Sequence, residues 1–276
     1  IKTEEIKTII EACTGLYLEA SSNTPTVSNS GEISLKLEVL NRSDISCNLV
    51  SYNMSTIEES IQKNIKLLSN NKFNFEESLN LTNANYTTPY WLNKKGTLGM
   101  YEVDDRVLIG QPETPRDIHV TFNLRINNMP ISFKKDVVYR YSKPDKGELY
   151  RPLEIIPEVS ASITEKVIIF DNDQQQNIQV KVRAGKDGVD GHIQLAYPEG
   201  WTTYPNKQRI KLNNKDEEQL LTFTIIPPKN QSEGYITPIV SVGDNIYTKE
   251  LVEISYEHIP FQTVLLPSQS KVVRIN

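Results

Sequence analysis

The chain has 276 residues, of which 24% are charged and 38% hydrophobic, and 30 basic against 35 acidic side chains give a net charge of −5. No face dense in Lys and Arg stands out, which argues against nucleic acid as a partner. No apolar run approaches the ~20 residues that cross a bilayer, so no membrane span is predicted.

The first residues predict an amphipathic helix within 1–16. Apolar side chains recur at helical spacing and would lie on one face of it. Because the chain starts at Ile1 without Met, on a helix already under way, we expect this helix to link from an upstream domain. Its apolar face holds Ile6, Ile9, Ile10, Cys13 and Leu16 and is expected to cover a preceding domain or the side of the first sandwich. The interdomain candidates on it are Ile6, Ile9 and Cys13.

The two cysteines, Cys13 and Cys47, have no metal-ligand spacing and could form at most one disulfide. Cys13 falls on the expected buried face of the helix and Cys47 falls in a strand. Two buried thiols are therefore the preferred interpretation, and a disulfide between them is the alternative.

A first β-sandwich domain is predicted over 17–143. Residues 33–39 alternate apolar and polar, and the turn at 41–44 predicts a hairpin with 45–52. Residues 65–68 are either a third strand or the end of a short helix, and 70–115 are rich in loops. Residues 118–126 and 131–141 form the clearest predicted hairpin.

The stretch Ser142–Pro152 holds two prolines and a glycine between the two blocks of strands. Proline fixes φ, and Asp145-Lys146-Gly147 is turn chemistry. We interpret this stretch as the joint between two separately folding domains.

The second block, 152–258, carries seven short apolar runs separated by turns rich in Asn, Gly and Pro. Short strands at such spacing are typical of an immunoglobulin-like or fibronectin III-like sandwich. The fold class is thus mainly β, with two tandem sandwiches and an N-terminal helix. Residues 259–276 are expected to be a tail leading to a further domain.

Several motifs together resemble a known family. They are EACTGLYLEA at 11–20, TPYWL at 88–92, LIGQPE at 108–113, KGELYRPL at 146–153 and YEHIPFQ at 256–262. The chain resembles the region after the catalytic domain in large bacterial deacetylases of the LmbE/PIG-L type. Separately, YPEGW at 197–201 and FTIIPP at 223–228 are similar to the "NEW3" sandwich found beside glycosidase and sugar-binding modules.

The resemblance implies a zinc-dependent deacetylase domain before residue 1 and a location outside the cytoplasm, in the periplasm or on the surface of a Gram-negative bacterium. That family's His-Pro-Asp-Asp metal motif has no counterpart here, since none of the three histidines precedes Pro-Asp-Asp. No catalytic or metal residue is therefore assigned, and no cofactor is expected in this chain. The expected partners are the other domains of the same polypeptide.

The sequence gives only weak evidence for a calcium site or a glycosidase site. Asp171 and Asp173, or the acidic loop at 185–191, could serve Ca²⁺, but turn capping is the preferred explanation. Adjacent carboxylates such as Asp104 and Asp105 point to opposite faces of a strand, unlike a glycosidase pair. His258 is interpreted as an interface residue at the exit from the second domain.

Aromatic side chains in loops are the best positive candidates for a binding site. Flat rings on a rigid sandwich can stack on sugars while nearby Asn side chains bond hydroxyls. Core packing is the preferred alternative for the two tryptophans. The candidate glycan-contact residues are Tyr90, Trp91, Tyr101, Trp201 and Tyr204.

The sequence thus predicts a non-catalytic accessory region that positions or docks a deacetylase-like catalytic domain. A carbohydrate-binding module that uses the loop aromatics is the first alternative. A glycoside hydrolase fragment is the second, and it requires two carboxylates across a cleft.

Overall fold

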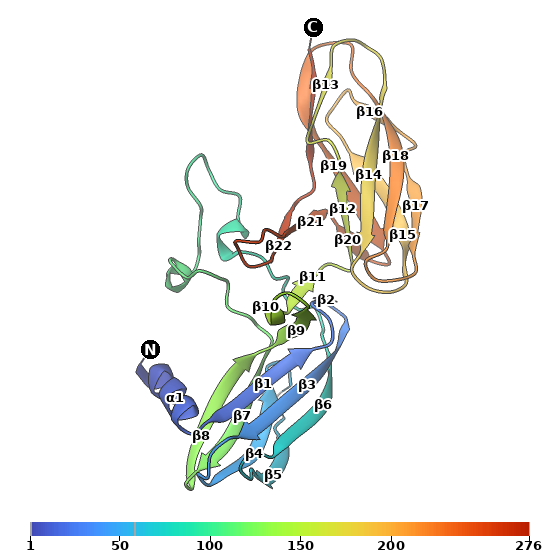
Figure 1. Cartoon of the computed structure of the whole chain (residues 1–276). Coiled ribbons are helices and arrows are strands. Elements are labelled where there is room, and N and C mark those ends of the chain that lie inside the picture. The colour runs from blue at the N-terminus through green and yellow to red at the C-terminus, as the bar shows by residue number, and fades with distance from the viewer. Residues whose placement is uncertain (1, 58, 276) are drawn as a thin grey trace. The chain divides into compact units, whose positions relative to one another are not determined.

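The computed structural model describes residues 2–57 and 59–275, which are built mainly of strands, and the predicted mainly β class is confirmed (Figure 1). By its internal contacts the chain divides into two compact units. Unit 1 is Ile1–Asn85 with Pro115–Glu154, and unit 2 is Tyr86–Thr114 with Ile155–Asn276. The segment 86–114 therefore belongs to unit 2, although the sequence placed it in the first domain.

Unit 1 is a sandwich of a five-stranded sheet, in the order β10-β9-β1-β3-β6, and a four-stranded sheet, in the order β5-β4-β7-β8. Both sheets bury alternate apolar side chains, because successive residues of a strand point to opposite faces. The strands are β1 (Leu16–Ser22), β2 (Thr26–Ser28), β3 (Glu32–Asn41), β4 (Cys47–Met54), β5 (Ile61–Lys66), β6 (Lys72–Asn80), β7 (His119–Ile126), β8 (Met129–Asp136), β9 (Val138–Lys143) and β10 (Gly147–Pro152). β11 (Glu154–Ile156) begins at the last residue of unit 1 and continues into unit 2.

The predicted pairing of 33–39 with 45–52 is wrong. β3 pairs with β1 and β6, whereas β4 pairs with β5 and β7, so the turn between them carries the chain from one sheet to the other. The buried Asn41 side chain holds this crossing, since its amide donates to the carbonyls of Ile45 at 3.1 Å and Leu67 at 3.2 Å. The same residue types form hairpin turns and turns that lead from one sheet to another, so the sequence does not distinguish the two.

The hairpin predicted for 118–126 with 131–141 is confirmed in part, as β7 and β8, which pair from Ile126–Met129 to His119–Asp136. The prediction is wrong for 138–141, which belong to β9 and pair with β1 and β10 in the other sheet. Asn127 and Asn128 both have positive φ, of 47° and 67°, as a two-residue hairpin turn of the favoured hand requires.

The expected joint at Ser142–Pro152 is also a hairpin, formed by β9 and β10 inside unit 1. Gly147 begins β10 with φ of 72°, a left-handed conformation that favours glycine. The proline and glycine signals were thus correctly interpreted as a turn, but this turn lies within a unit rather than between units.

Helix α1 (Lys2–Cys13) begins and ends close to the predicted bounds, but its apolar face is not buried. Ile6 and Ile9 are more than half exposed, and Cys13 is exposed as well. The sequence expected all three to lie under other residues. Leu16, counted with the same face, is instead the first residue of β1 and is buried.

The two free thiols are expected to react at very different rates. Cys13 is exposed, whereas Cys47 is buried in β4, and burial raises the pKa of the Cys47 thiol to about 11. At pH 8 only about one Cys47 thiol in a thousand would be ionised, and the thiolate is the reactive form. Titration with a thiol reagent should therefore show one fast thiol, lost in Cys13→Ser, and a second that reacts only on unfolding. Two fast thiols, or none, would contradict this arrangement.

Unit 2 is a second sandwich, with a four-stranded sheet in the order β12-β14-β18-β16 facing a sheet in the order β13-β23-β19-β15-β17, where β20 also pairs with β19. This arrangement confirms the predicted immunoglobulin-like fold. Two 3-10 turns lie in the segment 86–114. The elements are η1 (Tyr90–Leu92), η2 (Arg106–Leu108), β12 (Val159–Ile163), β13 (Val167–Phe170), β14 (Gln176–Ala184), β15 (Val189–Ala196), β16 (Thr202–Tyr204), β17 (Gln208–Leu212), β18 (Glu218–Ile226), β19 (Ser232–Val242), β20 (Asn245–Tyr247), β21 (Lys249–Ile254), β22 (Gln262–Pro267) and β23 (Ser270–Arg274).

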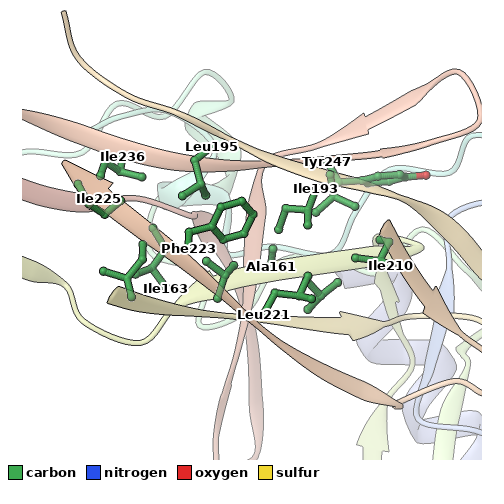
Figure 2. Close-up of a cluster of buried hydrophobic side chains, with 14 of the residues drawn as sticks. Ala161, Ile163, Ile193, Leu195, Ile210, Leu221, Phe223, Ile225, Ile236 and Tyr247 are labelled. Atoms are coloured by element: carbon green, nitrogen blue, oxygen red, sulfur yellow. The ribbon is translucent and has the colours of Figure 1, made fainter. Parts of the chain in front are cut away.

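The core of unit 2 lies between these two sheets. Figure 2 shows Phe223 of β18 beside Leu195 and Ile193 of β15, and all three are buried. The C-terminal residues contribute to this core, because β23 pairs with β13 in parallel and with β19 antiparallel. The expectation that 259–276 is only a tail is therefore wrong for β23, which is an internal strand of the sheet.

Candidate functional site

The segment 86–114 is a long loop whose two ends are joined by side-chain hydrogen bonds. The Thr114 hydroxyl donates to the Thr88 carbonyl at 3.0 Å and accepts from the Tyr90 backbone N–H at 2.9 Å. The Tyr90 hydroxyl donates to the Gln111 carbonyl at 3.2 Å. Loops of this length that close on themselves are commonly functional.

The start of the segment is also fixed to the rest of unit 2. The backbone N–H of Thr87 donates to the Ile155 carbonyl, and the Ile155 N–H donates to the Thr87 hydroxyl, both at 2.9 Å. The Trp91 ring stands edge-on to the Tyr90 ring, with 4.8 Å between centroids. Tyr90 is 8% exposed, so its ring serves to anchor the segment and is not free to stack on a sugar.

Beyond this anchored neck, the polar side chains of the segment are occupied with one another. The Lys94 amine lies 2.7 Å from Glu102 and 2.5 Å from Asp104, and the hydrogen bonds to Asp104 and Glu102 raise the pKa of Lys94. Asp105 accepts a hydrogen bond from the Val107 N–H at 2.9 Å and so caps η2. These carboxylates therefore bond to other groups of the same loop.

The apolar side chains of the segment, in contrast, face solvent. Leu98 is fully exposed and Val107 is 78% exposed. Singly exposed apolar residues are ordinary, but a concentration of large ones in one segment is typical of an interaction surface. We call the set the apolar loop residues: Leu98, Met100, Tyr101, Val107 and Ile109.

Trp201 is a core residue. It is 1% exposed, and its indole N–H donates to the Ser232 hydroxyl at 3.1 Å. Its ring lies edge-on to the Phe170 ring, with 5.2 Å between the ring centroids. The structure therefore contradicts Trp201 as a glycan contact and supports the packing alternative.

Tyr204 differs from Trp201 although it lies only three residues later. It ends β16 on the outer face of its sheet and is 70% exposed. Trp91 is partly buried at the neck of the loop, and Tyr101 is one of the apolar loop residues. The five candidate aromatics thus do not converge on one site, and only Tyr101 and Tyr204 present largely open rings.

The remaining interdomain candidate, His258, is exposed and stacks on Tyr256, with 5.8 Å between ring centroids. Within 2–57 and 59–275, no group of three or more His, Cys, Asp and Glu side chains is arranged to hold a metal ion. In the same residues, no helix is long and apolar enough to cross a membrane.

Buried carboxylates, which sequence reasoning missed, are held by structural partners. Glu158 accepts from the Tyr247 hydroxyl at 2.9 Å and pairs with Lys186 at 2.8 Å. Burial, reinforced by the hydrogen bond to Glu158, raises the pKa of Tyr247. In unit 1, Glu19 pairs with Arg140 at 3.2 Å. No local pattern marks these residues. Glu158 lies in a bend between β11 and β12, and Glu19 lies in β1, where a glutamate would normally be expected to face solvent.

No family model matches the chain, and no curated protein matches it. The resemblance to LmbE/PIG-L deacetylases and to the "NEW3" sandwich therefore gains no support from these comparisons.

Solved structures match at low similarity. The native conformation of Escherichia coli alpha-2-macroglobulin has 11% identity and a TM-score of 0.32, over 94% of this chain and 17% of that chain. The methylamine-reacted Salmonella alpha-2-macroglobulin has 11% identity and a TM-score of 0.32, over 94% of this chain and 16% of that chain. A Porphyromonas gingivalis protein of unknown function has 9% identity and a TM-score of 0.20, over 94% of this chain and 98% of that chain. This chain thus spans about a sixth of the macroglobulins, and at these scores the matches define neither its family nor its function.

Proposed function

We propose that this chain is a non-catalytic docking region that holds another protein domain through the apolar loop residues. The observation that carries the proposal is the combination of a fixed neck with an exposed apolar surface. The hydrogen bonds at Thr114 and Thr87 hold the ends of the loop in place, while Leu98 and Val107 stand in solvent. Covering such side chains is favourable by about 25 cal/mol for each Å² removed from water.

The polar groups of the loop favour docking over catalysis. Asp104 and Glu102 both pair with Lys94, and Asp105 caps η2. A glycosidase needs two carboxylates that face each other across a cleft, one of them held protonated. The loop carboxylates are instead exposed and paired, so a hydrolase role has no specific observation in its favour.

We further propose that the docked domain is the deacetylase-like domain of the same polypeptide, which the resemblance implies. Its five motifs lie at 11–20, 88–92, 108–113, 146–153 and 256–262, and two of the five lie in the segment 86–114. Zinc would then be held by that other domain, and the whole protein would work outside the cytoplasm. This part of the proposal rests on the resemblance alone.

Hydrogen exchange tests the docking. Backbone exchange in 86–114 would be measured in this chain alone and after addition of the domain encoded directly upstream of residue 1 in the same gene. We expect at least tenfold slower exchange in the loop when the domain is present. The triple variant Leu98→Ser, Met100→Ser and Val107→Ser should abolish this protection.

A matched control removes exposed apolar side chains of similar size from the sheets of unit 2. Val167, Ile169 and Leu220 are each more than half exposed, and their replacement by serine should leave the loop protection unchanged. Equal loss in both triple variants, or no protection in the wild-type chain, would overturn docking through the loop. An upstream domain unrelated to deacetylases that still protects the loop would retain the docking and overturn the proposed partner.

A further inference from the structure

A second surface, on the sheets of unit 2 rather than on the loop, has the chemistry of a sugar-binding face. It lies on the outer side of β14, β18 and β16, three neighbouring strands of one sheet (Figure 1). Cross-strand register places Tyr204 opposite Thr224, and Thr224 opposite Asn177. These three side chains therefore form one row across the sheet.

Two further rows flank the first on the same side of the sheet. Thr202 lies opposite Ile226, and Gln179 lies opposite Thr222. All of these residues point away from the core, because their neighbours Ile178, Phe223 and Thr203 are buried. The Tyr204 face is defined as Asn177, Gln179, Thr202, Tyr204, Thr222, Thr224 and Ile226, of which only Ile226 is aliphatic.

The Tyr204 face carries amide and hydroxyl groups and no formal charge. The first charged pair beyond it, Lys181 with Glu218 at 3.1 Å, is already neutralised. Covering a charge costs free energy unless the ligand supplies a partner, whereas amides and hydroxyls can exchange water for sugar hydroxyls at little cost. The face thus suits a neutral ligand rich in hydroxyl groups and disfavours an ionic one.

The row through Tyr204 contains both elements of sugar recognition. The Thr224 hydroxyl donates to the Asn177 side-chain oxygen at 2.8 Å, which orients the amide. The Asn177 side-chain nitrogen and the Tyr204 hydroxyl make no hydrogen bond to any other residue in the described part of the chain. An open ring beside an oriented donor can stack on the apolar face of a pyranose while the donor bonds a hydroxyl.

We propose that the Tyr204 face binds a neutral polysaccharide, with Tyr204 as the stacking platform and Asn177 and Gln179 as hydrogen-bonding groups. This site is separate from the loop of the proposed docking function and does not depend on it. The ladder of the sheet fixes the backbone positions of the contacting residues before binding, which suits an extended chain of repeating sugars.

Isothermal titration calorimetry of the whole 276-residue chain tests this proposal. The probes are the neutral hexasaccharides of cellulose, xylan, mannan, starch and chitin. We expect one class to bind with a dissociation constant of roughly 0.1 to 1 mM, as a shallow open face permits. Tyr204→Ala should weaken that binding at least tenfold and Asn177→Ala about threefold to tenfold, while binding should change less than twofold between 50 and 500 mM NaCl.

The matched control is Tyr235→Ala, which removes a tyrosine of similar exposure from β19 in the other sheet, and it should leave binding unchanged. Asn177→Ala and Gln179→Ala keep the proposal testable if Tyr204→Ala alters the melting temperature. No binding by any probe at 5 mM would overturn the proposal. Binding lost in Tyr101→Ala but kept in Tyr204→Ala, or binding confined to charged glycans, would overturn it as well.

Discussion

Replacement of Trp201 by alanine is expected to destabilise unit 2 by about 3–5 kcal/mol, the range for deleting a buried indole. The ring is almost fully buried, packs edge-on against Phe170 and donates a hydrogen bond to Ser232. Its removal would leave a cavity between the two sheets. The surrounding strands cannot move in to fill it, because each is hydrogen-bonded to its neighbours in its own sheet. Urea denaturation followed by circular dichroism would measure the change in free energy of unfolding.

Two companion variants separate the contributions to this loss. Ser232→Ala keeps the ring but leaves the buried indole N–H without its partner, and should cost about 1–3 kcal/mol. Tyr235→Ala removes an exposed ring and should change stability by at most about 0.5 kcal/mol. In Trp91→Phe, Trp201 is the sole emitter and should fluoresce in the blue and resist acrylamide. A loss below about 1 kcal/mol in Trp201→Ala, or a red, quenchable emission, would show that the ring is not in the core.

Gly185→Ala is expected to have an effect of similar size for a different reason. A Cβ atom added at Gly185 would lie 2.0 Å from the Pro157 carbonyl oxygen and 3.1 Å from its carbonyl carbon. The obstacle is backbone, and it is held in place because the Gly185 N–H donates to the Glu158 carbonyl at 2.8 Å. The strands must separate to admit a methyl group, so the free energy of unfolding should fall by about 3 kcal/mol or more.

Gly188, three residues later in the same turn, provides the matched control. It has φ of 70°, but an added Cβ atom would meet no atom within 4 Å. Gly188→Ala should therefore cost only the left-handed backbone penalty of about 1–2 kcal/mol. Equal losses in the two variants would mean that backbone conformation, and not collision, explains the glycine at 185.

These two glycines illustrate what the sequence can and cannot supply. Both belong to one polar run between strands, and turn chemistry correctly predicts that the chain reverses there. The collision at Gly185 involves Pro157, a residue far away in sequence, so no local pattern reveals it. The strands and the turns could both be predicted from the sequence, because alternating apolar residues and turn residues are local features.

Pairing, in contrast, depends on contacts between distant segments. The hairpin of β7 and β8 was predictable because two asparagines at its turn adopt positive φ. The partners of β3 were not, since the turn after Asn41 resembles a hairpin turn yet leads to another sheet. In the candidate site, the sequence offered five aromatics and favoured core packing for the two tryptophans, which is correct for Trp201, but it gave no ground for predicting that Tyr90 is buried and Tyr204 exposed. Burial in a sandwich is decided by the facing sheet.

The parallel pairing of β13 with β23 has a mechanical consequence. β13 lies near the start of the main part of unit 2 and β23 lies at its end, and the two strands are hydrogen-bonded side by side in the same direction. A pull on the chain before β13 and after β23 would act along both strands at once, in opposite senses. The bonds of the ladder would then be loaded together in shear rather than opened one at a time. The β13–β23 ladder should thus resist tension better than a terminal antiparallel hairpin, which would peel apart.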